Sequence, residues 1–170
     1  MKRLKSLLIV FVVLFAFKSA SAQNAIPLSK LIDLANCQSL NIFDTKVRVM
    51  GYSFEKKVED DKSTLSIYTK RLSTSTLIFT LSLTYKDYDD NKPVISFDAS
   101  SNVVPDYIGK IKQQATALKF TESTENCESD NENAVIFCYK SLKYSLSLFD
   151  IARREENNTH NIYKVTIFKK

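Results

Sequence analysis

The feature that most constrains the fold is a long alternation of apolar and polar residues that occurs twice in the chain. In the first stretch, TLIFTLSLTY, one face would carry Leu77, Phe79, Leu81, Leu83 and Tyr85. In the second stretch, LKYSLSLFDI, one face would carry Leu142, Tyr144, Leu146 and Leu148. Because successive side chains of a strand point to opposite faces, each stretch predicts a long strand with one buried and one wet face.

Six further segments, of varying regularity, suggest shorter strands around these two. With the two long stretches included, the expected strands are 52–58, 64–71, 76–85, 94–99, 118–127, 134–141, 143–152 and 161–168. Polar turns separate them, and Pro93 is tolerated only at the start of its strand because proline cannot donate a ladder hydrogen bond.

Two helices are expected before the first strand. Residues 28–36 carry apolar residues at helical spacing and follow Pro27, which suits a first helical turn. Residues 42–50 form a second helix, with Asn41 as the N-cap and Gly51 as the left-handed residue that ends it.

A third helix is expected between the two sets of strands, and it has the clearest helical periodicity in the chain. Its apolar residues are Val104, Tyr107, Ile108, Ile111, Ala115 and Leu118. We expect Asn102 or Ser101 to cap it and Pro105 to lie in its first turn.

The chain therefore shows one pattern twice, a helical element followed by four strands, over residues 27–100 and 101–170. Phe54 would correspond to Phe120, Leu77 to Leu142 and Phe97 to Ile167, at offsets of 65 to 70 positions. Chance similarity between amphipathic strands is the alternative. We expect an α+β fold in which both halves join into one curved eight-stranded antiparallel sheet, with helices on one face.

The N-terminus has the three parts of a secretory signal. A basic start with Lys2, Arg3 and Lys5 precedes the apolar run Leu7–Phe17, and Ala20 and Ala22 fit a cleavage site. The run is short for a membrane anchor, which needs ~20 residues, although an uncleaved anchor is the alternative. We expect cleavage after Ala22, which leaves residues 23–170 as one periplasmic or extracellular domain with no integral membrane segment.

Removal of residues 1–22 also changes the charge of the chain. That segment holds four basic residues and no acid, so the net charge of +5 falls to +1. A nearly neutral domain gives little support to long-range attraction by nucleic acid or an anionic membrane.

The three cysteines are compatible with an oxidising compartment. Cys127 and Cys138 flank a segment with a polar first half, so they could face each other across a hairpin and form a disulfide. Cys37 would then be a small buried thiol, although a bridge from Cys37 to either of the others remains open.

The order of elements resembles that of the beta-lactamase inhibitor proteins, which repeat a helical element and four strands. The resemblance covers residues 23–170 and rests on element order, without a shared motif, and the second half here has one clear helix where that family has two. It implies binding of an enzyme across the open sheet face, and no binding residue carries over. The segment ending in SASAQN is also similar to the signals of exported proteins of Bacteroidetes-type bacteria.

Motifs for catalysis are weak in this chain. The single histidine, His160, is expected in a polar turn before the last strand, without a recognisable partner, and Glu155 and Glu156 are balanced by neighbouring arginines. Gly51 and Gly109 are the only glycines, which excludes most glycine-rich phosphate loops. We therefore expect no catalytic residues and no cofactor.

Interpretation of the segment DYDDN as a calcium loop also fails. Asp87, Asp89 and Asn91 match the first ligand positions, but Lys92 stands where the sharp turn needs glycine and Asp98 where glutamate is usual. We expect no metal site.

The polar side of the two long strands is the remaining candidate surface. It would present Thr80, Ser82, Thr84, Ser145 and Ser147, and Tyr68 and Tyr139 would anchor a partner if exposed. We expect an exported protein-binding module, such as an inhibitor, an immunity-type protein or an adaptor. The alternative is a small-ligand or lipid-binding cup of the cell envelope.

Overall fold

A computed structural model describes residues 25–73, 78–88, 93–124, 127, 133–155 and 158–170. The expected signal segment, 1–22, lies outside the described residues, as do Leu77, Asp89 and Asn91.

The first two helices lie close to their expected positions. Helix α2 spans Leu28–Ala35 and α3 spans Leu40–Val49. The Ser39 hydroxyl accepts the Ile42 backbone N–H at 3.4 Å, so Ser39 is the N-cap of α3 and the expectation of Asn41 is wrong. Gly51 has a φ of 85°, which confirms the left-handed residue expected after this helix.

The third helix, α4, begins later than expected and spans Tyr107–Ala117. The backbone N–H groups of Val103 and Val104 donate to the Ser100 carbonyl, so this segment forms a turn after the strand that precedes it. The expected caps Ser101 and Asn102 are therefore wrong, and Asp106 is the N-cap, in a left-handed conformation. Val104 is still fully buried, which explains its place in the apolar pattern.

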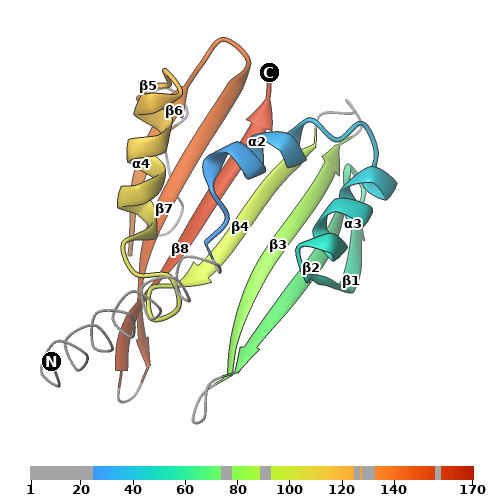
Figure 1. Ribbon diagram of the computed structural model, residues 1–170, viewed down its shortest axis with the longest axis horizontal. Helices are drawn as coiled ribbons and strands as arrows, with labels where there is room; N and C mark the ends of the chain where they lie inside the picture. The colour runs from blue at the N-terminus through green and yellow to red at the C-terminus, as the bar shows by residue number, and fades with distance from the viewer. Residues whose placement is uncertain (1–24, 74–77, 89–92, 125–126, 128–132, 156–157) are drawn as a thin grey trace, which may run out of the picture.

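All eight strands belong to one antiparallel sheet, in the order β1-β2-β3-β4-β8-β7-β6-β5. The strands are β1 (Ser53–Asp60), β2 (Ser63–Ser73), β3 (Ile78–Tyr88), β4 (Val94–Ser100), β5 (Thr121–Glu122), β6 (Ala134–Lys140), β7 (Tyr144–Glu155) and β8 (Asn158–Lys169). The sheet is open and twisted, and α2, α3 and α4 lie on one side of it (Figure 1). The expected α+β class with helices on one face is confirmed. The fifth strand is two residues long where ten were expected.

The fourth strands of the two halves pair with each other in the middle of the sheet. Ile95 lies opposite Ile167, and Phe97 lies opposite Val165, in the pairing of β4 with β8. Helix α2 packs over this pairing and contacts both strands. The order of strands is thus the same when counted outward from either side of the β4–β8 junction.

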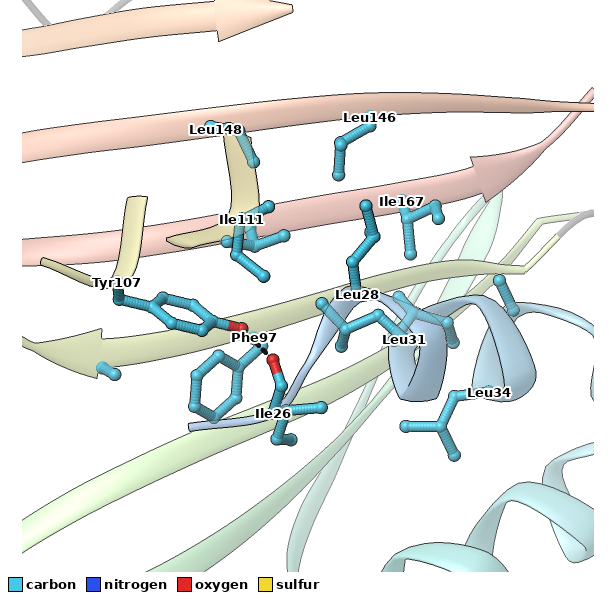
Figure 2. Close-up of a cluster of buried hydrophobic side chains, with 14 of the residues drawn as sticks. Ile26, Leu28, Leu31, Leu34, Phe97, Tyr107, Ile111, Leu146, Leu148 and Ile167 are labelled. Atoms are coloured by element: carbon cyan, nitrogen blue, oxygen red, sulfur yellow. Dashed lines mark hydrogen bonds between the residues drawn. The ribbon is translucent and has the colours of Figure 1, made fainter. Parts of the chain in front are cut away.

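The core lies between the three helices and the sheet. Leu28 and Leu31 of α2 are fully buried against residues of β4, β7 and β8 (Figure 2). The Tyr107 hydroxyl donates to the Ile26 carbonyl at 2.6 Å, and its ring meets Phe97 edge-on at 5.3 Å. Each large apolar side chain buried here contributes ~2 kcal/mol relative to exposure.

The two halves are more similar in strand order than in their individual residues. Phe97 and Ile167 are both fully buried, as the proposed correspondence requires, but Phe54 is 45% exposed and Phe120 is 7% exposed. Leu142 is 98% exposed because β7 begins only at Tyr144, so its expected place on the buried face is wrong. Duplication therefore stays a prediction.

Two buried serines provide a matched test of hydrogen bonding in the sheet. The Ser66 hydroxyl has no hydrogen-bond partner among the described residues, whereas the Ser96 hydroxyl lies 2.9 Å from that of Thr166. We expect Ser66→Ala to leave the free energy of unfolding unchanged or raise it, and Ser96→Ala to lower it by about 1 kcal/mol. Urea unfolding measures both, and equal losses would contradict the assignment.

Candidate functional site

The register of the sheet assigns each described strand residue to one of two faces. Tyr68, Tyr85, Phe97, Val165 and Leu148 are buried under the helices. Residues that alternate with them point to the other side of the sheet. The three described helices all lie on the first side (Figure 1). We name this second side the open face.

The hydroxyl residues expected on the polar side of the long strands do lie on the open face. Thr80, Ser82 and Thr84 lie on the face of β3 opposite to the buried Tyr85, and Ser145 and Ser147 lie on the face of β7 opposite to the buried Leu146 and Leu148. All five are at least partly exposed. Their placement follows from the strand alternation, while their role in binding stays a prediction.

The two candidate tyrosine anchors are on the wrong side of the sheet. Tyr68 is 1% exposed and Tyr139 is 5% exposed, both under the helices. The Tyr68 ring packs against Phe43 of α3 at 5.5 Å, and the Tyr139 hydroxyl donates to Glu122. Neither side chain is accessible enough to anchor a partner, so this expectation is wrong.

A row of hydroxyls crosses the middle of the open face. Thr84 lies opposite Ser96, Ser96 opposite Thr166, and Thr166 opposite Ser147, so the row joins four adjacent strands. The Thr84 hydroxyl also donates to the Ser96 carbonyl at 3.4 Å. The sequence pointed to Thr84 and Ser147 at the ends of this hydroxyl row. The sequence did not indicate Ser96 and Thr166 as members of the row, because the pairing of β4 with β8 leaves no local pattern in the sequence.

The next row contains a carboxylate and an ammonium group on neighbouring strands. Asp98 of β4 lies opposite Lys164 of β8. Burial raises the pKa of the Asp98 carboxyl above its ordinary value, and the charge of Lys164 opposes this shift. Desolvation is the larger of the two effects, so the ionised Asp98 carboxylate lowers the stability of the folded protein.

This destabilisation predicts how Asp98 affects the free energy of unfolding at different pH values. A raised pKa means that the folded protein binds the proton more tightly than the unfolded chain, so stability decreases as pH rises above about 4. We expect Asp98→Asn to be more stable than the wild type at neutral pH and equally stable near pH 3, where both chains are uncharged at this position. Urea unfolding at the two pH values checks this. A loss of stability at neutral pH would show that the attraction to Lys164 dominates instead.

Apolar side chains also occupy the open face, on the side opposite to the core. They are partly exposed and lie in two groups, one on each side of the junction. The group on the first half is Val58, Leu65, Ile67 and Val94, and the group on the second half is Ile136, Phe149, Ile151, Ile162 and Phe168.

The disulfide between Cys127 and Cys138 lies at the β6 edge of the open face. The two Cα atoms are 5.8 Å apart, which confirms the expected pairing. Cys138 lies opposite Ser147, at the end of the hydroxyl row.

A hollow of about 630 Å³ adjoins the disulfide, and its lining includes Lys112, Glu122 and Phe137. The Lys112 ammonium lies 2.9 Å from the centre of the Phe137 ring.

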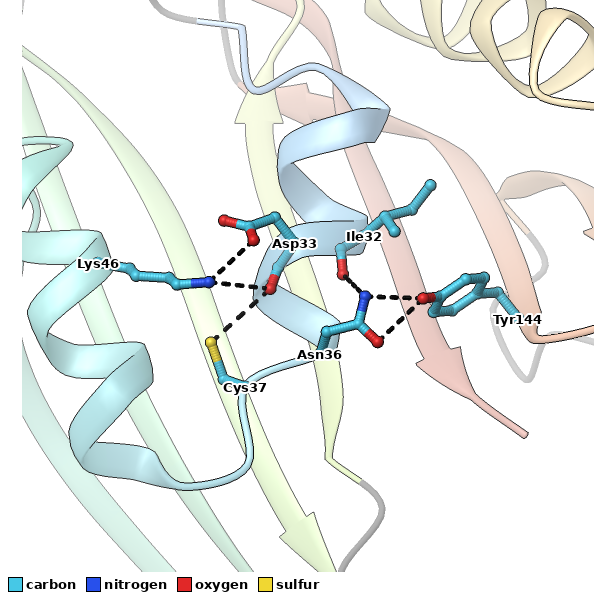
Figure 3. Close-up of polar contacts among 6 residues, drawn as sticks. All are labelled: Ile32, Asp33, Asn36, Cys37, Lys46 and Tyr144. Carbon is cyan, nitrogen blue, oxygen red and sulfur yellow. Dashed lines mark hydrogen bonds and ion pairs between the residues drawn. The ribbon is translucent and has the colours of Figure 1, made fainter.

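Cys37 is a buried free thiol, as expected when the other two cysteines pair. Burial raises its pKa, and the thiol donates to the Asp33 carbonyl at 3.8 Å (Figure 3). The Lys46 ammonium lies 2.9 Å from the Asp33 carboxylate, and Asn36 exchanges hydrogen bonds with the Tyr144 hydroxyl. These contacts tie α2 to α3 and β7, and they belong to the helix side of the sheet.

His160 lies within β8, opposite Arg153 of β7, and not in a turn before the strand as the sequence suggested. Among the described residues, no group of three or more histidine, cysteine, aspartate or glutamate side chains is placed to hold a metal ion. The described helices are all too short to cross a bilayer.

Comparisons with protein-family models, with curated proteins and with solved structures found no match.

Proposed function

We propose that this chain is an exported protein-binding module whose open face docks on another protein, as an inhibitor, an immunity-type protein or an adaptor does. One observation carries the proposal: a whole face of an eight-stranded sheet, with nine partly exposed apolar side chains, has no described helix against it. Exposed apolar surface of this kind, mixed with hydroxyls, is typical of interaction sites.

The size of the open face also supports a protein partner. Apart from the two-residue β5, the sheet has seven strands of 7 to 12 residues, which span ~29 Å at ~4.8 Å spacing and run ~23–40 Å at ~3.3 Å per residue. A rectangle of ~29 by ~25 Å approaches the ~800 Å² that each partner buries in a standard interface.

Export and the resemblance to the beta-lactamase inhibitor proteins fit the same proposal. The basic and apolar N-terminus has the composition of a secretory signal, and the disulfide is compatible with an oxidising compartment. The proposal assigns no catalytic role to the domain.

Site-specific photocrosslinking tests the proposed docking face. We expect Thr166→p-benzoylphenylalanine to form one discrete protein adduct in envelope extracts of the source cells. The matched control is Thr116→p-benzoylphenylalanine, because Thr116 is exposed on α4, on the helix side. Absence of an adduct at position 166, or equal adducts at both positions, would contradict the proposal.

A second candidate is a small-ligand protein, favoured by the hollow beside the disulfide. Its volume of about 630 Å³ lies within the ~300–1,000 Å³ common for ligand sites. A cup between helices and sheet is less well supported, because apolar side chains pack there (Figure 2). Native mass spectrometry of the purified domain distinguishes a small-ligand protein from a protein-binding module, since a retained small molecule would favour the small-ligand protein.

A further inference from the structure

The outer edge of strand β1 has no described strand beside it. β1 is the first strand in the order of the sheet, and all eight of its residues are exposed. Its main contacts are with β2 on its inner side and with α3. The backbone N–H and C=O groups along such an edge can form hydrogen bonds with a further strand. The edge of β1 is therefore a place at which the sheet could be extended.

The regular part of β1 runs from Lys56 to Asp60. Before it, the register with β2 shifts between Phe54 and Lys56, and a bulge of this kind interrupts the ladder of hydrogen bonds. After it, the chain turns back, and the Asp60 carboxylate accepts the Lys62 backbone N–H at 3.0 Å. A further strand can thus pair regularly with five residues, and the middle one is Val58.

The charges of these five residues are complementary to those of a second copy that runs in the opposite direction. Two lysines precede Val58, and two acids follow it. In an antiparallel pair with Val58 opposite Val58 of the second copy, Lys57 lies opposite Glu59 and Lys56 opposite Asp60. Opposite charges in such positions stabilise strand pairing, and like charges destabilise it. Moving the two-fold axis to Lys57 or to Glu59 would place each of these residues opposite its own copy, so that like charges would meet.

This register also keeps both faces of the sheet continuous. Lys57 lies opposite the buried Ser66 of β2, on the helix side, whereas Val58 lies opposite Leu65, on the open face. A two-fold axis perpendicular to the sheet brings like faces of the two copies to the same side. Lys57 and Glu59 form an ion pair within one strand, so two copies would bring four charges of alternating sign together on the helix side.

We infer that β1 pairs antiparallel with β1 of a second copy of this chain, with Val58 on the two-fold axis, so that the eight strands of each copy continue into one sheet. Lysines on an edge usually keep other strands away, but here each lysine meets an acid. A ladder of five residues is far smaller than a standard interface, so the dimer is weak and reversible. The open face stays uncovered, and the inference therefore does not depend on the proposed function.

Reversing the charges of Lys57 and Glu59 tests the pairing. We expect Lys57→Glu and Glu59→Lys each to weaken dimerisation ~tenfold, because each change sets like charges opposite each other twice. The double variant Lys57→Glu/Glu59→Lys keeps the net charge of the wild type and restores opposite charges, so its affinity should lie within ~twofold of the wild type. Sedimentation velocity of the purified proteins, at concentrations up to about 1 mM because the contact is small, measures these affinities.

A mixture of the two single variants separates pairing between copies from the ion pair within one strand. Each single variant loses its own ion pair, but Lys57→Glu and Glu59→Lys together restore opposite charges across the dimer, so the mixture should form mixed dimers. The matched control is Lys30→Glu on α2, which makes the same change in net charge as Lys57→Glu and should alter the affinity less than ~twofold. A wild type that stays monomeric at about 1 mM, or a mixture that associates no better than its components, would overturn the inference.

Cross-linking tests the position of the axis and the identity of the occupant. Directly opposite residues are close enough for a disulfide, and diagonal neighbours, ~7–8 Å apart, are not. Val58→Cys should therefore give a disulfide-linked dimer under mild oxidation, and Glu59→Cys should not; equal yields would overturn the inferred register. Val58→p-benzoylphenylalanine in envelope extracts should form an adduct with a second copy. An adduct with a different protein alone would assign the edge to a foreign strand and overturn the inference.

Discussion

Phe97→Ala is expected to lower the free energy of unfolding by about 4 kcal/mol, a large fraction of the ~5–15 kcal/mol that stabilises a typical domain. Phe97 is fully buried in β4 at the β4–β8 junction, and its ring packs against Tyr107 of α4. Truncation removes the apolar contacts of the ring and leaves a cavity between sheet and helix, and both losses add.

Phe168→Ala is the matched control for this prediction. Phe168 lies on the neighbouring strand at the same junction, but it points to the open face and is 38% exposed. We expect this change to cost about 1 kcal/mol or less, because water already reaches the ring. Urea unfolding of the two variants measures the difference. Similar losses at both positions would mean that the open face is packed as a second core, which would remove the proposed docking surface.

Loss of the disulfide is expected to lower the free energy of unfolding by about 3 kcal/mol. Cys127 and Cys138 are 11 positions apart, and cross-linking a loop of that size restricts the unfolded chain by roughly this amount. The double variant Cys127→Ser/Cys138→Ser should therefore unfold at lower urea concentration, and a reducing agent should shift the wild type towards the same midpoint.

Cys37 provides the control for the disulfide. Because Cys37 is a free buried thiol, Cys37→Ala should keep the sensitivity to the reducing agent, although it changes the packing beside Asp33. A reducing agent that leaves the wild type unchanged would contradict the prediction. The effect should reach the open face as well, since Cys138 pairs with Ser147 across β6 and β7.

Local sequence patterns, namely strand alternation, helical periodicity and a helix-ending glycine, were sufficient to predict most of the architecture. The long strands β3 and β7, the helices α2 and α3, and the left-handed Gly51 depend on residues close together in the chain. The residues that determine each of these features therefore lie within one short segment of the sequence. The same alternation places Thr84 and Ser147 on the open face without any information about strand pairing.

Sequence-based expectations failed where a contact outside the apolar periodicity decides the outcome. Val104 has the spacing of a helical residue, but a turn fixed by the Ser100 carbonyl buries it before α4 begins. Tyr68 alternates with two apolar residues, Leu65 and Ile67, and the packing of α3 determines that the tyrosine is the buried one. Neither outcome follows from the periodicity of the sequence alone.

The strand that joins the two halves of the sheet, β8, follows the other seven strands in the chain. Each four-stranded half is built from hairpins between consecutive strands, but the hydroxyls of Ser96 and Thr166 that meet at the junction are 70 positions apart. Pairing over such a separation requires closing a long loop, and contacts of this kind slow folding. Joining of the two halves is therefore expected to be slower than formation of the hairpins within each half.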